Sequence, residues 1–183
     1  MPDSSFTAIN KPAGEFDFTN DGARPTGAEG WLVMRAAARD RQAQDRLPGK
    51  PAGFHAGHLI PARYGGPGDT RNLVPMPGVK NTSFVSAVEN AVGRVLKFGD
   101  VYLRVTVEYT GAGKLPSTVR HEMFQRIDGI MRPVVGGNVV TNLADGSDAR
   151  MSDAQDQYTG KQLAPKHFLD GNDRRGMSPA GLH

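Results

Sequence analysis

The segment 54–81 constrains the fold more than any other part of the chain. It reads FHAGHLIPARYGGPGDTRNLVPMPGVKN, with two short apolar runs on either side of a glycine-rich polar stretch. We expect 54–60 to be extended and 61–71, with its three glycines and Pro67, to form a loop. The apolar run 73–76 is too short for a helix and suits a strand. The segment therefore predicts two neighbouring strands joined by a polar loop.

The next segment, 81–98, carries the clearest helical pattern. Its apolar residues recur at spacings of three and four: Phe84, Val85, Val88, Ala91, Val92, Val95 and Leu96. Asn81 or Thr82 can cap the start of this helix, and Gly99 with Asp100 can end it. Together the segments predict a β-β-α unit with a polar residue at each junction, and these residues are His58, Asn72 and Asn81.

Further strands follow this unit. The run 101–109 (VYLRVTVEY) alternates apolar and polar residues, which predicts a strand with one buried face. On its other face, Tyr102 and Arg104 suit either a solvated surface or contact with a nucleic acid. We expect 119–140 to form one or two more strands, broken at Asp128-Gly129 and Gly136-Gly137. The predicted fold class is α+β, a β-β-α unit on a small, mainly antiparallel sheet with flanking helices.

The rest of the chain is more polar. We expect 1–30 to be a polar leader that lies over the domain or stays loose. We expect 31–47, rich in Ala, Arg and Gln, to be a helix. We place the domain at 31–143 and interpret 144–183 as a loosely packed or disordered tail. An apolar fraction of 38% in 183 residues agrees with polar segments outside a packed core.

Charge and cysteine content narrow the chemistry. The formal net charge of +3 permits a polyanionic partner without requiring one. The absence of cysteine excludes disulfides and thiolate zinc sites, so a metal would need His, Asn, Asp, Glu or water. No apolar run approaches the roughly 20 residues of a membrane helix. The N-terminus has no apolar signal-peptide region, so export would need another route, unless this is a fragment of a longer chain.

The three junction residues suit hydrolysis of a phosphodiester bond. A neutral imidazole with a pKa of about 6.5 can take a proton from water at pH 7. A hard divalent cation stabilises the charge that develops on the phosphate, and Mg²⁺ often keeps several waters and few protein ligands. One Asn carboxamide oxygen with waters and the phosphate would then be a workable metal site.

The run AGHLIPARYGG…RNLVPM…N resembles the DNA/RNA non-specific endonuclease family, within the ββα-metal (His-Me finger) nucleases. The resemblance implies that His58 is the general base and that Asn72 supports the active site. It implies that Asn81 is the sole direct metal ligand, for Mg²⁺ or for Mn²⁺ or another divalent cation. Glu89 matches an acidic residue that orders the water shell of the metal.

One departure from the family pattern affects substrate binding. The family usually has Asp-Arg before Gly-His, whereas this chain has His55-Ala56. Three cations are candidates for the missing phosphate contact, and the sequence does not choose among them: Arg63, Arg71 and Lys80.

Structural interpretations compete with these roles. Asn81 also suits a plain helix cap, Asn72 a turn, and Glu89 a solvated helix position. We expect His55 to be an exposed or loop residue. The remaining histidines have no partners at useful spacing and are expected at the surface: His121, His167 and His183.

The sequence thus predicts a metal-dependent, non-specific endonuclease acting on DNA, with RNA as an alternative substrate. The GHLI…GG…NLVPM pattern resembles nuclease domains of bacterial polymorphic toxins, which implies delivery into the cytoplasm of a recipient cell and a cognate immunity protein. The alternative is a nucleic-acid-binding or toxin-interaction module of the same fold without catalytic activity.

Overall fold

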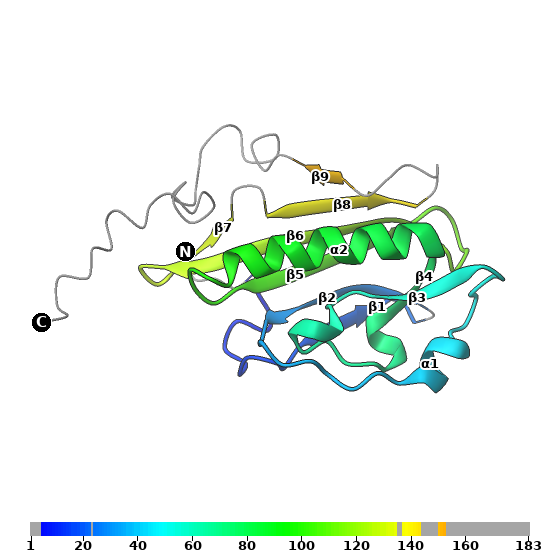
Figure 1. Ribbon diagram of the computed structural model, residues 1–183, viewed down its shortest axis with the longest axis horizontal. Helices are drawn as coiled ribbons and strands as arrows, with labels where there is room; N and C mark the ends of the chain where they lie inside the picture. Colours follow the sequence, from blue (N-terminus) through cyan, green and yellow to red (C-terminus); the bar gives the residue numbers. More distant parts are fainter. Residues whose placement is uncertain (1–4, 23, 135–136, 144–149, 153–183) are drawn as a thin grey trace, which may run out of the picture.

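The computed structural model describes residues 5–22, 24–134, 137–143 and 150–152. Within them, a large antiparallel sheet lies beside a two-stranded sheet and one long helix (Figure 1). The large sheet has the order β1-β2-β5-β6-β8-β9, and β7 pairs with another part of β6. Its strands are β1 (Asp17–Asn20), β2 (Pro25–Trp31), β5 (Tyr102–Tyr109), β6 (Pro116–Ile127), β7 (Ile130–Pro133), β8 (Asn138–Asn142) and β9 (Arg150–Ser152). The predicted α+β class with a mainly antiparallel sheet is confirmed.

The small sheet and the long helix form the predicted β-β-α unit. The elements of this region are α1 (Arg41–Asp45), β3 (Phe54–His58), the 3₁₀ turns η1 (Ala62–Tyr64) and η2 (Thr70–Asn72), β4 (Leu73–Pro77) and α2 (Gly78–Val95). Strands β3 and β4 are antiparallel, and α2 follows β4 without an intervening loop. None of the helices in the described part of the chain is long and apolar enough to cross a membrane.

One hydrophobic cluster joins α2 to the large sheet. The apolar stripe of α2 and the inner face of β5 belong to the same buried cluster, together with residues that flank the small sheet. The members from α2 and β5 are Val88, Ala91, Val92, Val95, Leu103, Val105 and Val107. Full burial of one such side chain contributes about 1.5–3 kcal/mol. The helix therefore packs against the large sheet, and α2 also contacts β3.

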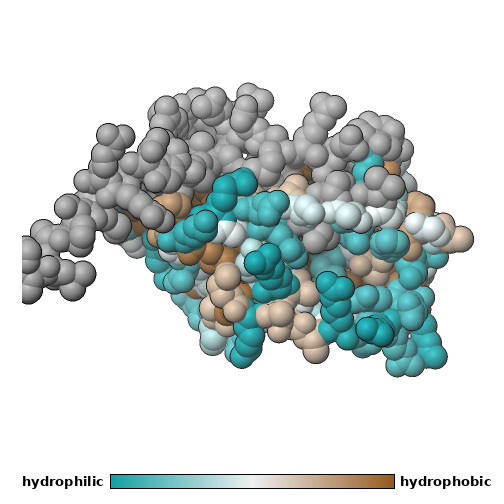
Figure 2. Space-filling model, viewed as in Figure 1, coloured by the Kyte–Doolittle hydropathy of each residue, from teal (hydrophilic) through white to brown (hydrophobic). Residues whose placement is uncertain are grey.

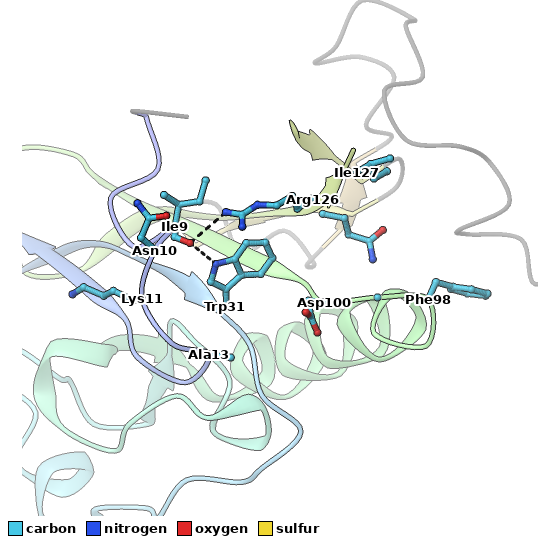
Figure 3. Close-up of a pocket in the computed structure, with 11 residues that line it drawn as sticks. Ile9, Asn10, Lys11, Ala13, Trp31, Phe98, Asp100, Arg126 and Ile127 are labelled. Atoms are coloured by element: carbon cyan, nitrogen blue, oxygen red, sulfur yellow. Dashed lines mark hydrogen bonds between the residues drawn. The ribbon is translucent and has the colours of Figure 1, made fainter. Parts of the chain in front are cut away.

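The outer face of the large sheet is covered by the N-terminal segment, which is one of the two arrangements expected for the leader. Ala8 is completely buried against this face, and Tyr102 Oη accepts a hydrogen bond from its main-chain N–H. Trp31 Nε1 donates to the carbonyl oxygen of Ile9, and the Arg126 guanidinium lies 5.3 Å from the centre of the Trp31 ring (Figure 3). Strands β1 and β2 also belong to the sheet, so a domain boundary at residue 30 would divide the fold.

The helix expected over 31–47 is largely wrong. Only α1 is helical, and Trp31 belongs to β2. The main-chain N–H of Leu32 donates to Val101, which extends the pairing with the sheet. Met34 is 71% exposed and α1 buries no residue. Good helix propensity without an apolar face to bury gives only a short helix.

Two further expectations on exposure are wrong. Arg104 does not lie on a solvated face, because it pairs with Glu29 at 2.8 Å and stacks on Phe6. His121 is completely buried, and its Nε2 lies 2.7 Å from the carbonyl oxygen of Leu59. His167 and His183 lie outside the described residues.

The predicted strand over 101–109 and the breaks after it are confirmed, but the range 119–140 contains parts of three strands, β6, β7 and β8, where one or two were expected. The break at Asp128-Gly129 is the turn between β6 and β7, and both residues have a positive φ. Gly136-Gly137 falls between β7 and β8, although Gly136 lies outside the described residues. Of the expected tail, β9 pairs with β8 in the large sheet. The remainder of 144–183 lies outside the described residues.

Candidate active site

His58 is the last residue of β3 and pairs with Leu73 of β4. Its neighbour Gly57 has to be small, because a Cβ there would lie 2.5 Å from the sulfur of Met76. The His58 side chain is half-buried, and its Nε2 is buried with no hydrogen-bond partner among the described residues. Burial, together with the positive charge of Arg39, lowers the pKa of His58 from 6.5 to about 4. The imidazole is therefore neutral at pH 7, as a general base must be.

Asn72 stabilises the chain immediately after His58. It is completely buried, and its Oδ1 accepts from the main-chain N–H of Ile60 at 2.8 Å. Its Nδ2 donates to the carbonyl oxygens of Ile60 and Pro67, both at 2.9 Å. These contacts tie the glycine-rich loop to the end of β3. Asn72 therefore acts through the backbone, and it does not line the cavity described below.

Asn81 does not cap α2. The helix begins at Gly78, three residues earlier than expected, and its N-cap is Pro77 with no side-chain cap bond. Thr82 is not a cap either, because its hydroxyl donates to the carbonyl oxygen of Gly78. The Oδ1 of Asn81 is buried and has no hydrogen-bond partner among the described residues. A buried oxygen of this kind costs about 1–3 kcal/mol, so its retention fits a ligand role better than a structural one.

The helix begins early because β4 leads directly into it. Pro77 has a fixed φ and no N–H to lose, so it suits the position immediately before a first helical turn. Gly78 is the first helical residue, and a Cβ there would lie 2.9 Å from Nε2 of His55. Asn81 consequently lies inside the first turn, with its side chain beside β3.

Glu89 lies two helical turns after Asn81 and faces the same cavity. Its Oε2 is 3.9 Å from Nη1 of Arg63, and its main-chain oxygen accepts from the hydroxyl of Tyr64 at 2.8 Å. The η1 turn that follows β3 is thereby attached to the middle of α2.

A cavity of about 470 Å³ brings these groups together. The charged and polar residues on its walls include His58, Asn81 and Glu89, joined by Arg39, Lys50 and His55. On the face seen in Figure 2, hydrophilic residues gather at the lower right, where Figure 1 places α1. A larger cavity of about 610 Å³ lies beside Trp31 and Asp100 (Figure 3), and none of His58, Asn81 and Glu89 lines it.

The candidate phosphate contacts have different positions. Arg63 is 62% exposed and near the cavity through its pairing with Glu89. Arg71 lies elsewhere, because it pairs with Asp69 at 2.8 Å and lies over the ring of Phe18. Lys80 is only 4% exposed and does not line the cavity. Sequence reasoning missed Arg39, which lines the cavity from the segment before α1 and has no local motif to signal it.

The donors present suit a hard cation held by few protein ligands. Among the described residues there is no group of three or more His, Asp or Glu side chains that could hold a metal ion. The available donor is the Asn81 Oδ1, with Glu89 in the same cavity to order water. Mg²⁺ commonly binds through one or two protein oxygens and several waters, so the site fits it.

The fold and the site define a ββα-metal nuclease: a two-stranded sheet with a neutral histidine, leading into a helix with an open carboxamide. The family model described as DNA/RNA non-specific endonuclease matches residues 7–129, which is more than half of the chain. The chain belongs to the DNA/RNA non-specific endonuclease family.

One solved structure supports this fold. The Sda1 nuclease with bound zinc ion superposes with a TM-score of 0.51 at 12% sequence identity, covering 72% of this chain and 75% of that one. EndoG, in its complex with EndoGI, gives a TM-score of 0.49 at 13% identity, covering 75% of this chain and 76% of that one. None of the curated proteins compared with the chain matches it.

Proposed function

We propose that this nuclease is a metal-dependent endonuclease that hydrolyses phosphodiester bonds of DNA, with RNA as an alternative substrate. One observation carries the proposal: the cavity contains a neutral imidazole and a carboxamide oxygen that are both buried without a hydrogen-bond partner among the described residues. Family membership supports the chemistry, and the formal net charge of +3 agrees with an anionic substrate.

In the proposed reaction, His58 takes a proton from water, and the resulting hydroxide attacks phosphorus. The bond from phosphorus to the 3′ oxygen breaks, and the leaving oxygen takes a proton from solvent water. His58 then gives its proton back to the solvent and returns to the neutral form. A bound divalent cation would neutralise charge on the phosphate and on the leaving oxygen. Asn81 would hold this cation and Glu89 would orient its waters, while Asn72 keeps the backbone after His58 in place.

The identity of the metal and of the nucleic acid can be tested together. Labelled duplex DNA and single-stranded RNA are incubated with the purified protein in Mg²⁺, in Mn²⁺ and in EDTA. The proposal expects cleavage of DNA with Mg²⁺ and no cleavage of either substrate in EDTA. Cleavage that persists in EDTA would contradict a metal-dependent mechanism.

We also propose that the chain is a toxin or effector domain, delivered into a target cell and blocked there by a cognate immunity protein. The support is the likeness of its GHLI…GG…NLVPM pattern to nuclease domains of bacterial polymorphic toxins. Expression in the bacterial cytoplasm is expected to stop growth, and expression of His58→Ala is expected to leave growth normal. Equal growth of the two cultures would contradict a toxic nuclease.

One observation favours a second function, that of a nucleic-acid-binding or toxin-interaction module without catalysis. His55-Ala56 replaces the Asp-Arg that usually precedes Gly-His, so the cavity has no cation at position 56. Binding of DNA or RNA without cleavage in any divalent metal would establish this second function.

A further inference from the structure

The cationic side chains around the active-site cavity differ in their ion-pair and hydrogen-bond partners. A phosphodiester is anionic and gains charge as it is attacked, so a cation with unoccupied donors stabilises it best. Arg63 faces the carboxylate of Glu89 at 3.9 Å, and Lys50 Nζ donates to the carbonyl oxygen of Gln44 at 2.7 Å. Arg39 lines the same cavity, and no carboxylate among the described residues forms an ion pair with it.

The backbone on both sides of Arg39 is anchored. On one side, the main-chain N–H of Ala37 donates to the carbonyl oxygen of Ala62 at 2.8 Å, which links the segment to the turn after β3. On the other side, Asp40 is the N-cap of α1 and accepts from the main-chain N–H of Ala43 at 2.9 Å. The base of the Arg39 side chain is therefore positioned by the fold, although the residue is exposed.

Gly68 allows this segment to approach the site. A Cβ at position 68 would lie 2.5 Å from the main-chain nitrogen of Asp40 and 2.9 Å from the carbonyl oxygen of Ala38. Any other residue would push the segment away from the loop. Gly68 thus allows the backbone on both sides of Arg39 to contact the loop after β3. Asn72 holds this loop through its hydrogen bond to Pro67.

The positive charge of Arg39 acts on the imidazole of His58. After burial, it is the second cause of the lowered pKa of His58. Ala56, on the cavity wall between His55 and Gly57, offers no charge. A guanidinium carries five N–H donors in a planar fork, and this geometry matches two phosphate oxygens.

We propose that Arg39 is a substrate-binding residue, which donates to phosphate oxygens of the nucleic-acid strand in the cavity and supplies the cation that position 56 lacks. This inference rests on the proposed function, because it names a substrate contact of the same cavity. It assigns the phosphate contact to a segment remote in sequence from the β-β-α unit.

Steady-state cleavage of duplex DNA in Mg²⁺ tests the assignment with three variants. Arg39→Ala is expected to lower kcat/KM about ten- to a hundredfold, because charge-assisted hydrogen bonds to phosphate are lost. Arg39→Lys is expected to recover part of the loss, since it restores the charge but not the fork. The matched control is Arg41→Ala, an exposed arginine two residues away that does not line the cavity and should cleave as the wild type does.

Binding without turnover separates this inference from the proposed function. Fluorescence anisotropy with labelled duplex DNA is measured in EDTA, in a His58→Ala background, over a series of salt concentrations. Arg39→Ala is expected to weaken binding and to reduce the slope of log affinity against log salt by about 1, as for one lost phosphate contact. Arg41→Ala is expected to leave the slope unchanged.

The two assays can contradict the role of Arg39 and the nuclease function separately. If the wild type cleaves and the alanine variants of Arg39 and Arg41 match it in both assays, Arg39 is not a substrate contact and the nuclease function stands. If the wild type cleaves neither DNA nor RNA, the catalytic function fails. The salt slope then still decides the role of Arg39: a reduced slope supports it and an unchanged slope overturns it.

Discussion

The active-site cavity and the outer face of the large sheet differ in how their buried polar groups are satisfied. On the outer face, Glu29 accepts from Arg104 at 2.8 Å and from the main-chain N–H of Thr7 at 2.6 Å. In the cavity, His58 Nε2 and Asn81 Oδ1 are buried without a partner among the described residues. Each unsatisfied atom is costly, and two of them in one cavity fit a site that gives up stability for chemistry. The contrast predicts that cavity mutations reduce activity and scaffold mutations reduce stability.

The largest expected effect is the loss of activity in His58→Ala. Removal of a general base lowers kcat/KM by about 10²–10⁴-fold. The melting temperature should hardly change, because His58 Nε2 has no hydrogen bond to lose among the described residues. Cleavage kinetics and thermal unfolding of the same preparation check both parts. Full activity in the variant would contradict the role of His58, and a large drop in melting temperature would show that it serves the fold.

Asn81→Ala is expected to cause a similar loss that higher Mg²⁺ concentrations partly restore, because the proposed metal ligand is removed. Combined with His58→Ala, it should add little, because residues that act as one catalytic unit are strongly non-additive. Cleavage rates of the wild type, both single variants and the double variant form the cycle. If the fold-losses in rate of the two single variants multiply in the double variant, His58 and Asn81 act independently.

Asn72→Ala is expected to reduce stability by about 2–4 kcal/mol, because it removes three hydrogen bonds, two of them buried, and leaves the Ile60 backbone unpaired. Asn90→Ala, at an exposed position of α2, is the matched control and should stay close to the wild type. Urea unfolding of the three proteins measures the difference. Equal stability of both variants would contradict the anchoring role of Asn72.

The smallest expected effect is the contribution of Glu29 to the pH dependence of folding stability. Burial alone would raise the pKa of this carboxyl, but hydrogen bonds from Thr7 and Arg104 outweigh it and lower the pKa below 4.5. A lowered folded-state pKa gives stability that is present above the unfolded value and is lost as pH falls through the folded one. Urea midpoints measured from about pH 6 to about pH 3 should fall less steeply in Glu29→Gln than in the wild type. Identical slopes would contradict the role of the pair.

The β-β-α unit could be predicted from the sequence because its signals are local. Apolar runs of strand length, a loop with three glycines and helical periodicity lie within one continuous segment. The identities of His58, Asn81 and Glu89 came from the same stretch, and the structure brings these three into one cavity. The start of α2 was missed by three residues, because Pro77 and Gly78 suggest a turn and instead begin the helix.

The N-terminal region could not be predicted because its structure depends on distant partners. Gly27 and Gly30 suggest a loop, yet a Cβ at Gly27 would lie 2.8 Å from the carbonyl oxygen of Val105, and one at Gly30 would lie 2.7 Å from that of Glu15. These glycines permit close approach of neighbouring backbone. The role of Arg39 could not be predicted for the same reason, because its charge acts on His58 only in the folded chain.

The most direct test of the account is the fate of supercoiled plasmid DNA with Mg²⁺, with EDTA, and with His58→Ala beside the wild type. We expect nicked and linear products with the wild type in Mg²⁺ alone, and intact plasmid in EDTA and with His58→Ala. Equal cleavage by His58→Ala, or by the wild type in EDTA, would contradict the claim that His58 and a metal at Asn81 together hydrolyse the phosphodiester bond.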